Sequence, residues 1–310
     1  MPIWRNVTAM PRAFLQYDVF TSHPFTGNQL AVFLDGRGLS ADQMQAIARE
    51  MNFSESTFIL PAETPGTDVR MRIFTPGLEL PMAGHPTIGS TFALAHTGVI
   101  AAGAPRVVFG LNIGPTPVDL AWDGSRLRFA WMTQRTPEFG PVVADRAAAA
   151  AMVGLREQDL HPGLPIQEVS CGVPFMMIPL RDRETVDRAA ADAGAVRQAA
   201  ASVPVEHGIF LFALTGDRGD ETVYSRMLAP HFGIREDPAT GSASGPLGCY
   251  LVRHGAVTGA AAQRIVSIQG VQMKRPSRIA IAIEGDASAI TRVKVGGEAV
   301  LVAKGELLLE

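Results

Sequence analysis

The sequence predicts an α+β fold made of two similar domains. The chain has 310 residues, a length that suits two domains of roughly 150 residues each. A short motif around Pro86 recurs around Pro238, about half the chain further on. Predicted strands are short, outnumber the helices and do not alternate regularly with them, which argues against a doubly wound parallel sheet.

The repeat rests on three pairs of segments that occur in the same order. Segment 83–90 (AGHPTIGS) aligns without gaps with the region of 236–244 (EDPATGSAS), so that Pro86 matches Pro238 and Gly89 matches Gly241. Segment 69–76 (VRMRIFTP) matches 223–230 (VYSRMLAP) at Val, Arg and Pro, and Val19 with 24–25 (PF) resembles Val169 with 174–175 (PF). We interpret these matches as an ancient duplication of about half the chain.

Hydrophobic periodicity and terminal signals place the elements. A capping-box pattern at 40–43 (SADQ) followed by apolar residues at helical spacing predicts a helix over 41–51. Proline suits a first helical turn, so further helices are expected over 86–96 and 238–253. Alanine-rich segments predict helices over 144–153 and 184–201. Strands are expected at 14–20, 29–34, 52–60, 69–74, 107–109, 116–122, 127–131, 167–170, 175–180, 208–213, 222–228, 265–268, 279–283, 291–295, 299–302 and 306–309, and the final ones are typical of antiparallel sheet.

The polar segment 133–141, which contains two prolines, is the expected domain boundary. We therefore predict an N-terminal domain over 12–132 and a C-terminal domain over 133–297. The last strand, about 298–310, can return to the first domain. Residues 1–12 lack the apolar stretch of a signal peptide and are expected to form a loose extension.

Composition excludes several classes of partner and site. The net charge of −3 is spread along the chain and gives no reason to expect nucleic acid or an acidic membrane surface. No run of about 20 apolar residues predicts a membrane span, so we expect a cytoplasmic protein. Cys171 and Cys249 are too few for a disulfide framework or a Cys-rich zinc site, and we expect them to act as buried small hydrophobes.

The two repeated motifs are candidate binding sites because helix N-termini carry free N–H groups and the positive end of the helix dipole. His85 and Asp237 lie at the two predicted helix starts, where each is either a capping or turn residue or a functional side chain. Ser242 is either a small residue that permits close packing or part of the site. If the duplicated domains face each other, both helix starts reach one cleft that suits a small carboxylate.

Glu55 is the candidate acid–base group outside these motifs. It lies among apolar and small residues in the predicted strand 52–60 and is either solvent-facing or a partly buried carboxylate. Burial would raise the pKa of such a carboxyl toward neutrality and allow it to take and return a proton. The histidines show no metal-ligand spacing, and no dinucleotide- or phosphate-binding motif occurs. We therefore expect neither a metal nor a cofactor.

The chain resembles the PhzF-like isomerase family of phenazine biosynthesis, within the wider diaminopimelate epimerase fold. The resemblance is carried by the segments 18–20 (DVF), 24–28 (PFTGN), 52–58 (NFSESTF), 83–90, 236–243, 269–270 (QG) and 275–278 (RPSR). It implies two pseudo-symmetric domains, each a strongly curved antiparallel sheet or barrel around a central helix, with the active site between them. A homodimer is also implied, although no pattern in the sequence supports one.

The resemblance further implies a cofactor-independent isomerase in which Glu55 moves a proton between carbons of a dihydro-hydroxyanthranilate-like cyclic carboxylate. His85, Asp237 and Ser242 occupy the family's other active-site positions, and Gly84 and Gly241 would bind substrate through the helix starts. Epimerase and racemase relatives carry paired cysteines where Gly84-His85-Pro86 and Asp237-Pro238 stand here. An epimerase with non-cysteine bases and a non-catalytic carboxylate-binding protein are the alternatives.

Overall fold

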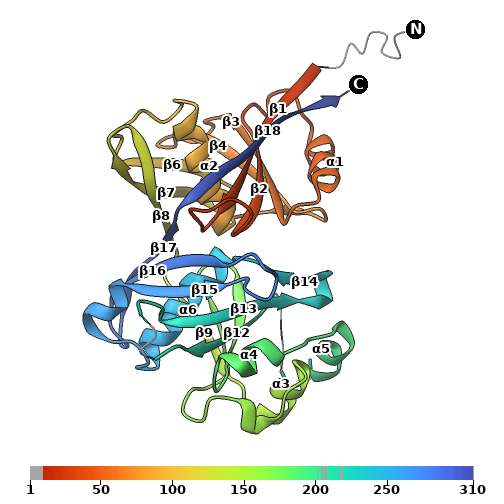
Figure 1. Cartoon of the computed structure of the whole chain (residues 1–310), viewed down its shortest axis with the longest axis vertical. Coiled ribbons are helices and arrows are strands. Elements are labelled where there is room, and N and C mark those ends of the chain that lie inside the picture. The colour runs from red at the N-terminus through yellow and green to blue at the C-terminus, as the bar shows by residue number, and fades with distance from the viewer. Residues whose placement is uncertain (1–9, 201, 204, 206–207, 217–218, 310) are drawn as a thin grey trace.

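The structure is a computed structural model that describes residues 10–200, 202–203, 205, 208–216 and 219–309. Two lobes are stacked along its long axis (Figure 1). The upper lobe contains β1 (Met10–Val19), β2 (Asn28–Phe33), α1 (Ala41–Met51), β3 (Glu55–Pro61), β4 (Val69–Phe74), β5 (Glu79–Leu80), α2 (Gly84–His96), β6 (Arg106–Leu111), β7 (Gly114–Asp123) and β8 (Arg126–Gln134), together with the last strand, β18 (Ala299–Leu309).

The lower lobe holds the remaining elements. They are β9 (Glu138–Val142), α3 (Arg146–Met152), β10 (Gln167–Ser170), β11 (Pro174–Pro179), α4 (Arg183–Arg188), α5 (Ala193–Ala199), β12 (Gly208–Leu214), β13 (Val223–Ala229), β14 (Ile234–Asp237), α6 (Gly241–Arg253), β15 (Ile265–Gln269), β16 (Ser277–Gly285) and β17 (Ile290–Gly297). Short 3₁₀ helices occur at Glu157–Asp159, Pro230–Phe232 and Gly259–Gln263.

Strand pairing follows the same pattern in both halves of the chain. In the first half β1–β2 is antiparallel, β2–β3 parallel, β3–β4 antiparallel, β4–β6 parallel, and β6–β7–β8 antiparallel. The second half repeats this order through β10–β11, β11–β12, β12–β13, β13–β15 and β15–β16–β17. The repeated pairing confirms the prediction of two pseudo-symmetric halves.

The sheet is mostly antiparallel, and each half also contains two parallel pairs that the sequence patterns did not indicate. Parallel neighbours need a crossover connection, which is usually a helix. The helix α1 connects β2 to β3, while α2 and α6 lie in the connections from β4 to β6 and from β13 to β15. The central helices are therefore the crossovers that permit parallel pairing.

Among the described strands, one pairing joins the two lobes, and another returns the end of the chain to the upper lobe. β8 pairs with β17 between the lobes, and β18 returns to the upper lobe to pair with β1 along its whole length. The segment expected to be a polar boundary, 133–141, contains the end of β8 and most of β9 rather than a continuous loop. The domain limits at 132 and 297 stay a prediction.

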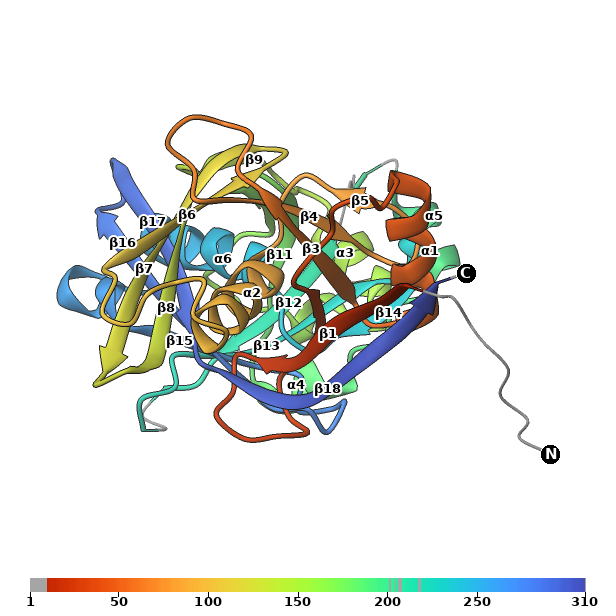
Figure 2. The ribbon, with the colours of Figure 1, turned by 90° about the horizontal axis from the view of Figure 1, so that it is seen from above.

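Both central helices are enclosed by the sheets, as Figure 2 shows for α2 between β1 and β8. Residues 84–94 of α2 are all buried, and in α6 residues 241–252 are buried except Ser242. A helix without a solvent-exposed face is typical of such an enclosed position. By contrast α1 is amphipathic: Ser40 and Gln43 form the predicted capping box, and Met44, Ile47 and Ala48 face the core.

The structure corrects several predicted boundaries. α2 starts at Gly84 rather than at Pro86, and α6 starts at Gly241 rather than at Pro238. The predicted helix 184–201 is two helices, α4 and α5, and its last residue, 201, lies outside the described residues. The predicted strands 299–302 and 306–309 are one strand, β18, and residues 10–12 of the predicted loose extension belong to β1. Residues 1–9 and 310 lie outside the described part.

Candidate active site

The two central helices meet at their first residues. A Cβ atom on Gly84 would lie 2.7 Å from Gly241 Cα, and one on Gly241 would lie 3.1 Å from Gly84 Cα. Only glycine permits this approach. The structure therefore places Gly84 opposite Gly241, a different register from the alignment that matched Pro86 with Pro238. The first N–H groups of both helices, which lack intrahelical acceptors, come together here.

Glu55 and His85 lie side by side next to this junction. Glu55 is the first residue of β3, and His85 lies in the first turn of α2 instead of preceding the helix. Glu55 Oε2 is 3.2 Å from His85 Nε2, and their side chains are 15% and 4% exposed. The two atoms do not meet hydrogen-bond geometry, so each is a buried polar atom without a hydrogen-bond partner within the described structure.

Asp237 completes the group from the other lobe. It is the last residue of β14 and is buried, and its carboxylate accepts hydrogen bonds from Asn28 Nδ2 (2.9 Å), Ser54 Oγ (3.1 Å) and Thr240 Oγ1. Asn28 begins β2 and its Nδ2 also lies 3.2 Å from His85 Nδ1. Asn28 therefore contacts both side chains that the repeated motifs singled out.

Burial sets the protonation states of this group. Desolvation raises the pKa of Glu55 well above its usual value, and the charge of Asp237 raises it further. Desolvation also raises the pKa of Asp237, to about 6, against the opposing effect of its hydrogen bonds. For His85, desolvation lowers the pKa to about 3. At neutral pH the imidazole is therefore uncharged, and a raised pKa makes Glu55 a stronger base than an exposed carboxylate.

Gln269 explains why α6 begins after Pro238. Its side-chain oxygen accepts from Thr240 N (3.1 Å), and its Nε2 donates to Asp237 O (2.8 Å) and to Thr240 Oγ1 (2.9 Å). These bonds hold residues 237–240 in a turn, and Thr240 becomes the residue before the helix. Asp237 is consequently not the helix cap that its sequence position allowed. Its carboxylate is left free to face the other lobe.

A buried ion pair fixes the loop that precedes Asn28. Arg275 Nη2 lies 2.6 Å from Asp18 Oδ1, and the same guanidinium donates to the carbonyls of Thr26 and Gly27. Asp18 also accepts from the backbone N–H of Phe25 (2.6 Å). Because Arg275 comes from the second half of the chain, this pair ties the two lobes together beside the site.

The structure thus brings together all six predicted residues. Glu55, His85 and Asp237 form the polar group, and Gly84, Gly241 and Ser242 form the adjoining helix starts, with the Ser242 amide nitrogen 2.9 Å from the position of a Cβ on Gly84. Sequence reasoning assigned no role to Asn28, Ser54, Thr240 or Gln269. All four lie inside the segments that carry the family resemblance, and this position was the feature of the sequence that could have identified them.

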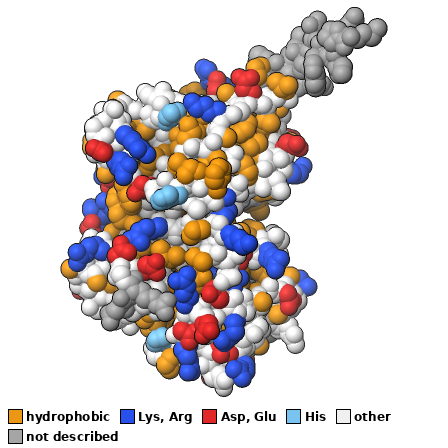
Figure 3. Space-filling model, viewed as in Figure 1, with side chains coloured by type: hydrophobic (Ala, Val, Ile, Leu, Met, Phe, Trp, Pro, Cys, Tyr) orange, Lys and Arg blue, Asp and Glu red, His pale blue; other side chains and the backbone are white. Residues whose placement is uncertain are grey.

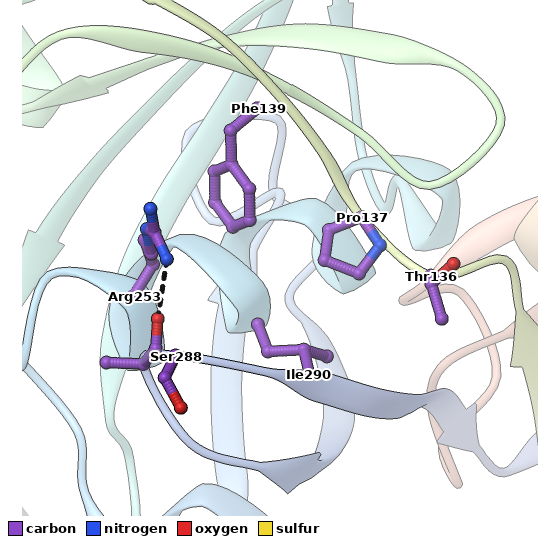
Figure 4. A pocket seen from close by; sticks show the side chains of 7 residues that line it. Thr136, Pro137, Phe139, Arg253, Ser288 and Ile290 are labelled. Carbon is purple, nitrogen blue, oxygen red and sulfur yellow. Dashed lines mark hydrogen bonds between the residues drawn. The ribbon is translucent and has the colours of Figure 1, made fainter.

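The two cysteines are not part of this group of site residues. Cys171 and Cys249 are buried, unlinked thiols whose sulfur atoms are 3.8 Å apart. A pocket of about 220 Å³ beside Arg253 is lined by Phe139, Pro137 and Ile290 and contains none of the site residues (Figure 4). Within the described ranges no group of three His, Cys, Asp or Glu side chains could hold a metal ion. Basic and acidic side chains are interspersed on the face that Figure 3 shows.

Among the residues that the structure describes, no helix has both the length and the apolar character needed to cross a membrane.

Comparison with solved structures defines the class of protein. A PhzF-family phenazine biosynthesis protein from Bacillus anthracis matches with a TM-score of 0.84 and 26% identity, covering 97% of this chain and all of that one. A hydroxyproline epimerase from Agrobacterium vitis shares the fold, with a TM-score of 0.67 and 12% identity over 97% of this chain and 92% of the epimerase. The predicted diaminopimelate epimerase-like α+β fold is confirmed.

Sequence comparison then identifies the family. The model of phenazine biosynthesis-like proteins (PhzC-PhzF) matches residues 17–305. The trans-2,3-dihydro-3-hydroxyanthranilate isomerase of Pseudomonas chlororaphis is 36% identical over 293 residues, which cover 94% of this chain and 98% of that enzyme. The chain belongs to the phenazine biosynthesis-like (PhzF) family, and it is an isomerase.

Proposed function

We propose that this isomerase shifts a proton between carbons of a small cyclic carboxylate, of the dihydro-hydroxyanthranilate type, without a cofactor. The observation that carries the proposal is the contact of Glu55 with a neutral His85 beside Asp237, at the junction of two helix starts. Such a group combines a base of raised pKa with donors and with backbone amides that favour an anion.

Glu55 is the proposed base and acid. Its carboxylate takes a proton from one ring carbon, and the electron pair of that C–H bond delocalises into the unsaturated ring. The protonated Glu55 then returns the proton to a second carbon, so that the double bonds move and Glu55 is regenerated. A carboxyl whose pKa is raised toward neutrality can serve in both directions.

The other site residues would bind the substrate and stabilise the charge that develops on it. The substrate carboxylate would bind the free N–H groups at Gly84, Gly241 and Ser242, where the two helix dipoles favour negative charge. Negative charge that develops on the ring during proton removal would be stabilised by the same backbone amides and by the hydrogen-bond donors around Asp237, such as Ser54 and Thr240. His85 and Asp237 would contact the ring, and His85 also lies against Glu55.

The test uses trans-2,3-dihydro-3-hydroxyanthranilate, the substrate after which a relative is named. We expect the protein to convert trans-2,3-dihydro-3-hydroxyanthranilate in D2O with movement of a double bond, observed by NMR. Glu55→Gln should lower the rate by a factor of about 10² to 10⁴, because it removes the base. Glu50→Gln, an exposed carboxyl at the end of α1, is the matched control and should retain the wild-type rate.

Three outcomes would overturn the proposal. Full activity of Glu55→Gln would show that another group moves the proton. Deuterium incorporation with inversion of a stereocentre and no double-bond movement would indicate an epimerase. Binding of the substrate without double-bond movement and without hydrogen exchange would indicate a non-catalytic carboxylate-binding protein.

A further inference from the structure

We propose that two copies of this chain associate through the free edge of β18, so that the sheets of their upper lobes join. Among the described strands, β18 pairs with β1 and with no other, and the pairing is regular from Ala303 to Leu309. Figure 2 shows β18 at the outer edge of the upper lobe, with β1 on its inner side. None of the six site residues lies on this edge, so the inference is independent of the proposed function.

The outer edge of β18 is open to another strand. A strand that is paired on one side leaves half of its N–H and C=O groups free on the other, and such an edge is a template for pairing with a second chain. Within the described part of the chain, residues 303–309 form no backbone hydrogen bond beyond those to β1. Lys304, Glu306 and Leu308 are exposed, the last of them to 64%. A second chain can therefore reach both the backbone and the side chains of this edge.

The charges of this segment are complementary to themselves when the strand runs antiparallel to its own copy. In a two-fold symmetric pair centred on Gly305, Lys304 of each copy lies directly opposite Glu306 of the other. Opposite charges at such cross-strand positions stabilise the pair. Charged side chains on an edge strand usually prevent association with other strands. Here they match a second copy of the same strand, which is why we assign this partner and not an unrelated extended peptide.

The same charges select one register among its neighbours. A symmetric pair centred on Lys304 would place two lysines directly opposite each other, and one centred on Glu306 would place two glutamates there. Like charges in these positions destabilise a pair of strands. Of the three registers, the one centred on Gly305 is therefore favoured, because it alone opposes unlike charges.

Apolar side chains support this register. Ala303 lies opposite Leu307 in it, and Val302 lies opposite Leu308, so that each apolar residue meets another. Leu308 is a large hydrophobic side chain that the single chain leaves exposed, and the pairing would cover it. Hydrophobic side chains also gather over the upper lobe where β18 crosses it (Figures 1 and 3). Association would therefore bury apolar surface in addition to joining backbone groups.

Sedimentation velocity of charge-reversal variants tests the interface. We expect the wild-type protein to sediment as a dimer. Lys304→Glu and Glu306→Lys each place like charges opposite each other twice across the edge, so each should raise the dimer dissociation constant about tenfold or more. An equimolar mixture of the two variants should associate as strongly as the wild type, because every charge in the mixed pair again faces its opposite. That recovery would also show that both variants remain folded.

Arg128→Glu is the matched control, because it makes the same change of charge at an exposed position on β8. It should leave the dissociation constant at the wild-type value. A monomeric wild-type protein would overturn the inference. A dimer that both reversals leave intact would place the interface on another surface, and a mixture that associates as weakly as its components would refute the proposed pairing.

Disulfide crosslinking tests the register directly. Residues directly opposite in an antiparallel pair have Cα atoms about 4.5–5.5 Å apart, a distance that a disulfide spans. Chains with Lys304→Cys and chains with Glu306→Cys, mixed and treated with glutathione disulfide, should therefore form a covalent dimer on a non-reducing gel. Either chain alone should crosslink much less, because its introduced thiols are two residues out of register. Cys171 and Cys249 are buried and should not compete. Equal crosslinking of the mixture and of the separate chains would contradict the register centred on Gly305.

Discussion

His85 is the residue whose charge the site suppresses most clearly. Desolvation lowers the pKa of its imidazole from 6.5 to about 3, and a backbone hydrogen bond to Gln29 only partly opposes this effect. In the unfolded chain the imidazole takes up a proton near pH 6.5, while the folded protein takes it up only near pH 3. The stability that this group contributes is therefore present above pH 6.5 and is lost as the pH falls toward 3.

Replacing His85 by asparagine should make the protein less sensitive to acid. Between pH 6.5 and 3 the free energy of unfolding of the wild-type protein should fall more steeply than that of His85→Asn, by up to about 1.4 kcal/mol per pH unit. Urea denaturation at a series of pH values measures both slopes. His96→Asn, at the exposed end of α2, is the control and should follow the wild type. Parallel curves for His85→Asn and wild type would contradict the prediction.

The sequence indicated some site residues and not others for a physical reason. Glu55, His85 and Asp237 could be named because each is out of place locally, as a charged or ionisable side chain among apolar residues or beside a helix start. Asn28 has no such local mark. Its role depends on His85 and Asp237, which are 57 and 209 residues away along the chain. Such contacts exist only once both lobes are folded.

At the scale of elements, the junction of α2 and α6 depends on two glycines. We expect Gly84→Ala to destabilise the protein by about 1–3 kcal/mol, because its Cβ would lie 2.7 Å from Gly241 Cα and the helix starts must move apart. The displacement would also misalign His85 and lower activity. Thermal denaturation and the isomerase assay measure the two effects.

Gly77→Ala is the control for that change. A Cβ on Gly77 would meet only Thr75 Oγ1, at 3.9 Å, in an exposed turn, so stability and activity should both stay near the wild-type values. If Gly84→Ala were as stable and active as Gly77→Ala, the glycine contact would not determine how the helices meet.

Helix boundaries were predicted well where the signal is local and poorly where the partner is remote. The limits of α1 follow from a capping box within its own sequence. The alanine-rich segment 184–201 favoured one helix. In the structure Arg226 donates hydrogen bonds to the carbonyls of Val186 and Ala189. Asp192 then accepts from Gly194 N and Ala195 N and starts a second helix. Arg226 lies on β13, so the break depends on tertiary structure.

At the scale of the whole molecule, the lobes are joined by strand pairing, by hydrogen bonds and by ion pairs, which include Asp18–Arg275 and Asp119–Lys294. The pairing of β8 with β17 and of β18 with β1 connects the ends and the middle of the chain. These long-range pairings were not readable from alternation alone, because alternation predicts that a strand exists and not which strand it pairs with. The repeat did predict that the two halves of the chain would be similar.

The Asp18–Arg275 pair supports a prediction for the whole molecule. Asp18 is 1% exposed, and desolvation raises its pKa against the opposing effects of Phe25 N–H and Arg275. Arg275→Ala would leave this carboxylate buried without its cation, so the free energy of unfolding should fall by about 3 kcal/mol or more. Activity should fall as well, because Arg275 also binds the carbonyls of Thr26 and Gly27, next to Asn28.

A second substitution separates the buried charge from the lost contacts. In the double variant Asp18→Asn with Arg275→Ala no uncompensated carboxylate remains, so urea denaturation should show a smaller loss than in Arg275→Ala alone. Arg37→Ala breaks the exposed pair with Asp35 and should leave the denaturation midpoint unchanged, since exposed ion pairs contribute little. If Arg275→Ala matched Arg37→Ala, the Asp18–Arg275 pair would contribute little to holding the lobes together. A double variant less stable than Arg275→Ala would show instead that the hydrogen bonds of Asp18, and not its charge, hold the loop before Asn28.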